Sequence, residues 1–576
     1  MLHKIKACID SSKIEEAYNL IIQNEYIYIN NDFYWILRGE LCQLIGEYET
    51  ASSCYTKAKL INPYNKESVK KLINVSIKLN KFNDVKSFEI EIGNMEKLIY
   101  NKLIENIQSN FNGLDNSGIL NLVEGMDDTT FYCNKDFLHG KSEIIKLDAI
   151  TDSISKRAHV IIPFTYTYVE IVKSLAKVNI ESCRIMLQDG EEIRYVEIDK
   201  EILESIKTDE YKRTITINKL SASDSNVNAL LKYIPEMYKD KYKLNIINGY
   251  DVLSLENKIT VPLKSPMTIG GFSMFLNYPM PNLTYNLEVG HASMIFKSIG
   301  NMAKKNKNFA FTQNEYQNVN KVCVTSNMDM IFQASATALQ EDKFLISGMP
   351  RTDTLLKTDG RRNLEKVLKI KLDNKKIIFN MPTFHKHDNS GVIQGDISLN
   401  NYVKINDFDY VEFDKYLEKN NMICVMKVHH AEAKSVSINK VKMKLKNIYF
   451  IDNSNLEKEN MDLYEIINAG DILITDYSSI YSDFLFMNKP VVFTNSDIEK
   501  YREDVGLLLE PYDFWTAGPK VKNQQDLQNE LLKSMDENYY RSEREKLRPV
   551  FFNSLEGGAT ERVWDFINGV FENEIK

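Results

Sequence analysis

Short apolar runs alternate with amphipathic stretches from about residue 130 onward, and this alternation limits the possible folds more than any other feature. Strands that alternate with helices form parallel sheets covered by helices, so the pattern predicts an α/β architecture. The region spans about 450 residues, which is too much for one sheet, so we expect two α/β domains. The expected strands are Thr130–Cys133, Glu143–Leu147, His159–Pro163, Arg184–Leu187, Lys243–Ile247, Asn286–Val289, Val322–Thr325, Phe344–Ser347, Lys376–Asn380, Met422–Val428, Ile448–Ile451, Asp471–Thr475 and Val491–Phe493.

Polar and charged residues follow directly after six of these runs. Ligands of open parallel sheets bind outside the carboxyl ends of the strands, so we expect these residues to gather at one edge. They supply imidazole, ammonium, guanidinium and hydroxyl groups, which suit phosphates, and two such sheets facing each other would hold a nucleotide diphosphate. The six stretches are 290–293, 326–327, 348–353, 382–387, 427–430 and 476–479.

The stretch DILITDYSSIYSDFLFMNKPVVF at 471–493 has two interpretations. Asp476, Ser478 and Ser479 can cap a helix whose apolar face packs on a sheet. The same groups can instead hold an anion, because a helix start carries free N–H donors and a partial positive charge. A second helix start, with Thr560 after a glycine pair, offers the same choice between a cap and a grip on phosphate or ribose.

The first hundred residues are typical of helices, and residues 34–63 resemble a tetratricopeptide repeat. A plain helical hairpin is the alternative interpretation. We expect a helical domain at 1–105 and α/β domains at 116–355 and 356–576, with a polar linker after the helices. Surfaces of such repeats bind proteins, so a protein partner or self-association is expected. The residues at the repeat positions are Trp35, Gly39, Gly46, Ala51, Tyr55, Ala58 and Pro63.

The net charge of −8 and a pI near 5.7 argue against a nucleic-acid-binding protein. The seven cysteines form no C-x-x-C pair, which fits a reducing cytoplasm. We see no signal peptide and no apolar run of about 18 residues, so we expect a cytoplasmic protein with at most peripheral contact at the inner membrane face. The basic run at 304–309 is either a solvated loop or a contact for an anionic acceptor or membrane surface.

Five of these motifs resemble those of the CDP-glycerol:poly(glycerophosphate) glycerophosphotransferase family, the teichoic-acid polymerases and primases. The resemblance covers roughly residues 280–570, and it is most specific at 471–493. It also includes an echo of the family's W-H-G-T-P-x-K motif around His291. The matching segments are D-x-L-[IV]-T-D-Y-S-S at 471–479, G-x-P-R-x-D at 348–353, P-T-[FW] at 382–384, K-x-H at Lys427 and His429, and T-E-R-V at 560–563.

The resemblance implies a GT-B-like pair of Rossmann domains facing a cleft, with the acceptor at the first domain and the nucleotide donor at the second. It implies transfer of glycerol phosphate, or a related alditol or sugar phosphate, from a CDP-activated donor to a hydroxyl of a teichoic-acid or capsule-like polymer or lipid-linked acceptor, with release of CMP. The donor is a substrate, and no metal or other cofactor is implied.

The same resemblance implies roles for individual residues. The family's two functional histidines map to His291, which would take the hydroxyl proton, and His429, which would assist the leaving phosphate. Asp353 and Asp476 would orient their neighbours. The residues implied to bind the donor phosphates or ribose are Arg351, Thr383, Lys427, Ser478, Ser479, Thr560 and Arg562.

Four alternatives stay open from the residues. His291 lacks the family's preceding Trp and following Gly-Thr-Pro, which favours a scaffold that binds a nucleotide without turnover. A glycosyltransferase of the same architecture would use a nucleotide sugar instead. Arg351 and Asp353 can form an interdomain ion pair rather than a phosphate site. The histidines that could form a metal site are His385, His387, His429 and His430.

Overall fold

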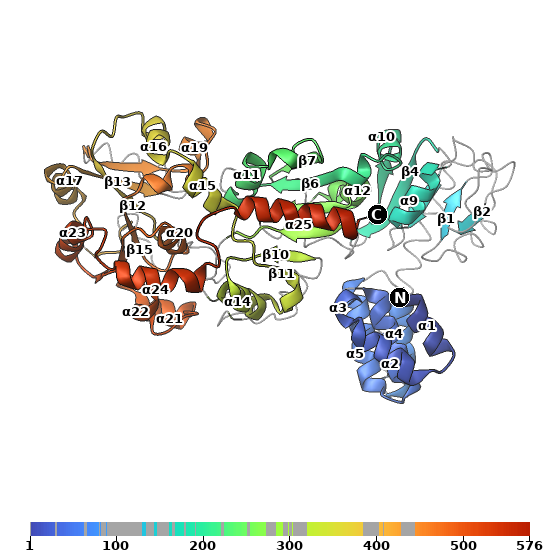
Figure 1. Cartoon of the computed structure of the whole chain (residues 1–576). Coiled ribbons are helices and arrows are strands. Elements are labelled where there is room, and N and C mark those ends of the chain that lie inside the picture. The colour runs from blue at the N-terminus through green and yellow to red at the C-terminus, as the bar shows by residue number, and fades with distance from the viewer. Residues whose placement is uncertain are drawn as a thin grey trace.

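The N-terminal part of the computed structural model is a bundle of helices, set apart from the rest of the chain in Figure 1. Helices α4 and α5 approach closely because Gly39 has no side chain: a Cβ there would lie 2.4 Å from Cε1 of Tyr55. The tetratricopeptide assignment of these helices stays a prediction. The helices are α1 (Leu2–Asp10), α2 (Ile14–Gln23), α3 (Glu25–Tyr28), α4 (Asp32–Leu44), α5 (Tyr48–Ile61) and α6 (Lys66–Lys78).

The structure describes only part of the chain. The described residues are 2–28, 31–62, 66–79, 81, 88, 130–133, 143–146, 160–163, 168–177, 180–189, 192–220, 224–249, 251, 254–271, 284–291, 296, 298, 302, 319–383, 402–406, 408–427 and 444–575.

A mixed five-stranded sheet in the order β2-β1-β3-β4-β5 precedes the first parallel sheet. Only β3 and β4 run parallel, which departs from the expectation of parallel sheets alone. Strands β4 and β5 are joined as a hairpin, and strands linked so closely pair antiparallel. The elements are β1 (Thr130–Cys133), β2 (Glu143–Lys146), β3 (Val160–Pro163), α9 (Tyr168–Lys177), β4 (Cys183–Asp189), β5 (Glu192–Ile198) and α10 (Lys200–Ser205).

The second sheet is parallel, with six strands in the order β11-β10-β9-β8-β6-β7. The sequence did not indicate β6 or β8, whose short runs carry threonines among the apolar residues. The elements are η3 (Tyr211–Arg213), β6 (Thr214–Lys219), α11 (Ser225–Lys232), η4 (Glu236–Tyr238), β7 (Lys243–Asn248), α12 (Leu255–Lys264), β8 (Met267–Gly270), β9 (Tyr285–Glu288), β10 (Lys321–Cys323), α14 (Asn327–Thr337), η8 (Glu341–Lys343), β11 (Phe344–Leu345) and α15 (Arg351–Lys357).

The third sheet is also parallel, in the order β14-β13-β12-β15-β16-β17, which is the strand order of a Rossmann fold. Its elements are α16 (Gly360–Leu368), β12 (Lys376–Asn380), α17 (Tyr410–Lys419), β13 (Met422–Lys427), β14 (Ile448–Ile451), α19 (Asn453–Lys458), η9 (Leu463–Glu465), η10 (Ile467–Ala469), β15 (Ile472–Thr475), α20 (Ile480–Phe486), β16 (Val491–Thr494), α21 (Ile498–Asp504), α22 (Tyr512–Trp515), β17 (Lys520–Val521), α23 (Gln524–Lys533) and α24 (Arg541–Phe551).

The last helix, α25 (Ala559–Asn573), returns to the second sheet, as Figure 1 shows. Its Val563, Trp564 and Ile567 are buried with residues of β6, β8 and α11, and the indole N–H of Trp564 donates to the Leu230 carbonyl at 3.1 Å. Helix α25 therefore packs on the first Rossmann-like domain. From its position in the sequence, we expected this helix to belong to the second domain, at 356–576.

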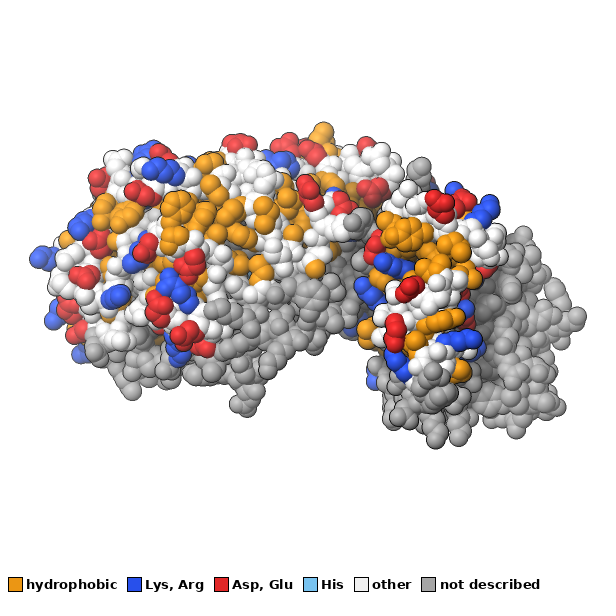
Figure 2. Space-filling view, turned by 90° about the horizontal axis from the view of Figure 1, so that it is seen from below, with side chains coloured by type: hydrophobic (Ala, Val, Ile, Leu, Met, Phe, Trp, Pro, Cys, Tyr) orange, Lys and Arg blue, Asp and Glu red, His pale blue; other side chains and the backbone are white. Residues whose placement is uncertain are grey.

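The surface drawn in Figure 2 mixes acidic, basic and apolar side chains across the described residues. Charge on this face therefore does not gather into a field of one sign. Among the described helices, none combines the length and the apolar character that a membrane crossing requires.

Candidate active site

The strand order of the third sheet reverses between β12 and β15, where a ligand of such a sheet binds. Asp476, directly after β15, is fully buried there. Its Oδ1 accepts a hydrogen bond from the backbone N–H of Thr383 at 2.7 Å and another from the Thr383 hydroxyl at 2.8 Å. Thr383 follows β12, so this contact fixes the ends of the two central strands against each other. The Thr383 donors are occupied by Asp476 and are not open toward a phosphate.

Ser478 and Ser479 lie at the turn between β15 and α20, and both are partly exposed. Neither hydroxyl caps the helix through a hydrogen bond; Ser479 is held through its carbonyl, which accepts from the Ser482 hydroxyl at 2.8 Å. The capping interpretation of these serines therefore fails, since no side-chain cap is formed.

Lys427 ends β13, the neighbour of β12. Burial lowers the pKa of its ammonium group, while the charge of Asp452 opposes this shift.

A turn with a positive φ at Gly290, after the end of β9, sets the orientation of His291. Gly290 has a φ of +77°, and a Cβ there would lie 3.2 Å from Cε of Met349 and 3.3 Å from the Cys323 carbonyl oxygen. Only glycine adopts this positive φ and avoids these close contacts without strain. The Gly290 carbonyl accepts a hydrogen bond at 2.7 Å from the buried side chain of Asn226, so the turn is fixed in place.

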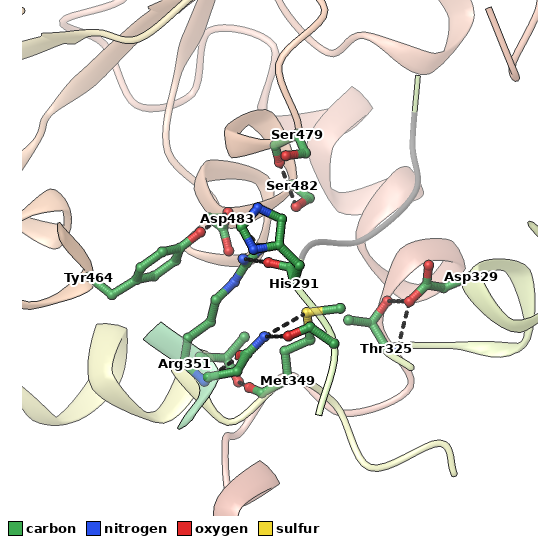
Figure 3. Close-up of polar contacts among 12 residues, drawn as sticks. His291, Thr325, Asp329, Met349, Arg351, Tyr464, Ser479, Ser482 and Asp483 are labelled. Carbon is green, nitrogen blue, oxygen red and sulfur yellow. Dashed lines mark hydrogen bonds and ion pairs between the residues drawn. The ribbon is translucent and has the colours of Figure 1, made fainter. Parts of the chain in front are cut away.

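The imidazole of His291 points toward the start of α20 (Figure 3). Its side chain keeps access to solvent. Burial, and then the charge of Arg351, lower the pKa of His291 to about 4. The ring is therefore neutral near pH 7, the form that can accept a proton.

Arg351 is buried between the two Rossmann-like domains rather than open to a phosphate. Its guanidinium donates to the His291 carbonyl at 2.6 Å and forms an ion pair with Asp483 of α20 at 3.2 Å. Its carbon Cζ lies 4.6 Å from the ring centre of Tyr464. The sequence offered an interdomain ion pair as the alternative for Arg351, but its partner is Asp483 and not Asp353.

Asp353 instead holds the first residues of α25. Its two carboxylate oxygens accept from the backbone N–H groups of Ala559 at 3.1 Å and Thr560 at 3.0 Å. Arg562 donates to the carbonyls of Ser347 at 2.8 Å and Gly557 at 2.9 Å. A protein carboxylate therefore occupies the helix start that the sequence offered to a phosphate, and these residues join the returning helix to α15 and β11.

Several predicted site residues lie outside the described residues, namely His385, His387, His429 and His430. Their roles stay predictions. Within the described part of the chain, no three His, Cys, Asp or Glu side chains gather as a metal site would require.

The structure adds residues that the sequence did not indicate, notably Asn226, Tyr464 and Asp483. The hydroxyl of Tyr464 donates a hydrogen bond to Oδ2 of Asp483 at 2.8 Å, so Asp483 accepts hydrogen bonds from both Tyr464 and Arg351 (Figure 3). These residues carry no motif of their own, and only their meeting in space marks them. A polar residue on the apolar face of α20 was the one available signal.

Two parallel sheets in tandem, the second with Rossmann strand order, define a GT-B-like protein with its polar residues at strand ends. The solved structure of the wall teichoic acid polymerase TagF has the same fold, with a TM-score of 0.51 and 18% identity over 66% of this chain and 94% of that one. A helical region precedes the two domains.

The family model described as CDP-Glycerol:Poly(glycerophosphate) glycerophosphotransferase matches residues 249–569. The match covers more than half of the 576 residues, and the chain belongs to this family.

Curated relatives of this chain are teichoic-acid enzymes. The teichoic acid ribitol-phosphate polymerase TarK of Staphylococcus aureus is 26% identical over 377 residues, which are 61% of this chain and 68% of TarK. The ribitol-phosphate polymerase TarL of the same organism is 29% identical over 48% of this chain and 46% of its own length. A poly(glycerol phosphate) polymerase of Bacillus spizizenii is 28% identical over 42% of this chain and 60% of its own. The chain thus spans about half to two thirds of these relatives.

Proposed function

We propose that this protein transfers an alditol phosphate from a CDP-activated donor to a hydroxyl of a teichoic-acid-type acceptor and releases CMP. The observation that carries the proposal is the placement of Ser478, Ser479 and Lys427 at the carboxyl ends of β15 and β13, the parallel strands on either side of β12, with the neutral His291 aimed at the helix that follows the serines. Relatives named for glycerol phosphate and for ribitol phosphate support either alditol as the transferred group.

The reaction is attack by the acceptor hydroxyl oxygen on the β-phosphorus of the donor. A new P–O bond forms to the acceptor, the bond from that phosphorus to the bridging oxygen breaks, and CMP leaves with the bonding electron pair. Such transfers depend on positioning and on stabilisation of charge more than on covalent catalysis. The serine hydroxyls donate to the donor phosphates, and Lys427 and His429 stabilise charge on the leaving side.

His291 accepts the proton of the attacking hydroxyl. A pKa of about 4 makes a weak base in the free protein. The negative charges of a bound diphosphate favour the protonated imidazole and raise its pKa toward the working pH. Donor binding therefore activates the base.

The acceptor is a polyol-phosphate or sugar-phosphate polymer, or its lipid-linked start. Such an acceptor brings the protein to the inner face of the cell membrane as a peripheral protein. The helical domain, proposed at 1–105, is available for a protein partner or a second copy of the chain. The proposed α/β domains, 116–355 and 356–576, carry the transfer itself.

A titration calorimetry panel tests the donor class, with CDP-glycerol, CDP-ribitol, CMP, UDP-sugars and GDP-sugars against the wild type and the double variant Ser478→Ala/Ser479→Ala. We expect binding of CMP and a CDP-alditol, weakened in the variant. Preference for a UDP- or GDP-sugar would assign the protein to the glycosyltransferases. Binding of none would leave the scaffold interpretation.

A further inference from the structure

The segment that begins at His291 is fastened to helix α20 of the second Rossmann-like domain at two described points. The first is the carbonyl of His291 itself, and the second is Phe296, five residues later. His291 follows a strand of the first domain, whereas α20 follows the serines that the proposed function assigns to the donor. The two halves of the proposed site are therefore physically joined.

The first fastening is the guanidinium group of Arg351. One nitrogen holds the His291 carbonyl at 2.6 Å, and another pairs with Asp483 at 3.2 Å. Both side chains of the ion pair are almost fully buried, with 6% and 3% exposure. Asn226 accepts from the backbone N–H of Arg351 at 3.1 Å and donates to the Gly290 carbonyl, so the turn and the arginine are held together.

The second fastening is the ring of Phe296. The ring is 1% exposed, in the core of the second domain, and lies 5.5 Å from the ring centre of Tyr481 in a stacked arrangement. The backbone carbonyl of Phe296 accepts a hydrogen bond from the backbone N–H of Leu508 at 2.9 Å. The chain therefore leaves the first domain at His291 and is buried in the second at Phe296.

We propose that Arg351, Asp483 and Phe296 are positioning residues that fasten the His291 turn to α20, so that the imidazole keeps one geometry toward the serines at the start of that helix. The inference rests on the proposed function of His291 and of the serines. None of the three residues touches substrate in this account.

The geometry of the guanidinium explains the choice of arginine. Its planar fork reaches two acceptors in different directions at once, which a lysine ammonium on a flexible stem does not fix. Catalytic groups must be held within about 0.5 Å of their working position, and a misplacement of about 1 Å costs roughly 100-fold in rate. A buried fork and a buried ring supply that precision.

The charge that acts on the imidazole is that of Arg351, from α15. Arg351 is itself influenced by Asp483 of α20 and Asp329 of α14, while Tyr464 of η9 is neutral because burial raises its pKa. Burial and the charge of Arg351 both lower the pKa of His291 only while the turn stays fastened. Release of the turn removes both effects, so the imidazole then titrates in its ordinary range, near pH 6.5.

The first test reads this titration without any substrate, so it does not depend on the proposed function. The full chain is labelled with 13C at Cε1 of histidine, and His291→Asn assigns the signal. We expect wild-type His291 to stay neutral down to about pH 5. In Arg351→Met/Asp483→Asn, which leaves no unpaired buried charge, and also in Phe296→Leu, which keeps the charge of Arg351, we expect half-protonation between about pH 5.5 and pH 6.5. A variant ring that stays neutral to about pH 5 would overturn the proposal.

The second test measures turnover of a CDP-alditol by folded protein. We expect kcat to fall at least about tenfold in the double variant, with the donor KM within about threefold of wild type. Phe296→Leu keeps the core apolar and removes the stacking, and we expect its kcat to fall as well. Lys232→Met is the matched control, because it removes an interdomain ion pair, that of the exposed Lys232 with Glu465, and should leave kcat unchanged. Unchanged kcat in both Phe296→Leu and the double variant would overturn the proposal.

Discussion

Replacement of Asp353 separates a structural role from a donor-binding role at the start of α25. The carboxylate is fully buried and accepts two backbone N–H groups, those of Ala559 and Thr560. Loss of a helix cap costs about 0.5–2 kcal/mol, and a second buried N–H without a partner adds about 1–3 kcal/mol. We therefore expect Asp353→Ala to lower the free energy of unfolding by about 3 kcal/mol. Asp353→Asn keeps one acceptor oxygen, and we expect about half that loss.

The assay is urea unfolding followed by tryptophan fluorescence, because Trp564 of the same helix reports on its detachment. Trp35 and Trp515 are replaced by Phe in every variant, so that one indole remains. The loss of stability should come with a donor KM near that of the wild type in the protein that stays folded. Unfolding that matches the parent, together with a donor KM raised tenfold, would refute the structural assignment.

The remaining predictions concern other residues of the site and its support. We expect Gly290→Ala to lower kcat and to cost about 1–2 kcal/mol of stability, measured by urea unfolding, because its φ is +77° and its Cβ would crowd the Cys323 carbonyl. Trp564→Ala should cost about 3–5 kcal/mol in urea unfolding followed by circular dichroism, and a loss below about 1 kcal/mol would contradict the packing of α25. Ser478→Ala/Ser479→Ala should raise the donor KM at least about tenfold with unchanged unfolding, since each charge-assisted hydrogen bond contributes about 1.5–3 kcal/mol. A raised KM accompanied by lost stability would instead make the serines structural.

Much of the framework follows from local patterns. The strands that end in Asn380, Lys427 and Thr475 are continuous apolar runs bounded by polar residues, and the structure forms strands there, in the third sheet. Strands β6 and β8 were not predicted, because short runs that include threonine do not differ from loops in a single sequence. The mixed sheet was not predicted, because pairing direction depends on which strands meet and not on their composition.

The site was predictable only where a residue acts close to its own motif. Ser478, Ser479 and His291 stand where strand ends bring them. Arg351 and Asp353 lie in the same motif, but the structure engages both with protein groups that come from distant parts of the chain, 132 and about 206 residues away. Asn226 has no sequence signal that separates it from other polar helix residues, and Asp483 has only its place on the apolar face of α20. Contacts of this kind arise from tertiary packing, which local pattern does not encode.

The most direct test of the central claim is the identity of the products. The purified chain is incubated with CDP-glycerol or CDP-ribitol and a polyol-phosphate acceptor, and the phosphorus signals are followed by 31P NMR. We expect loss of the donor diphosphate signals, release of CMP and a new phosphodiester signal in equal amounts, and none of these changes in His291→Asn. Release of a nucleoside diphosphate from a nucleotide sugar, with no CMP from either alditol donor, would contradict it.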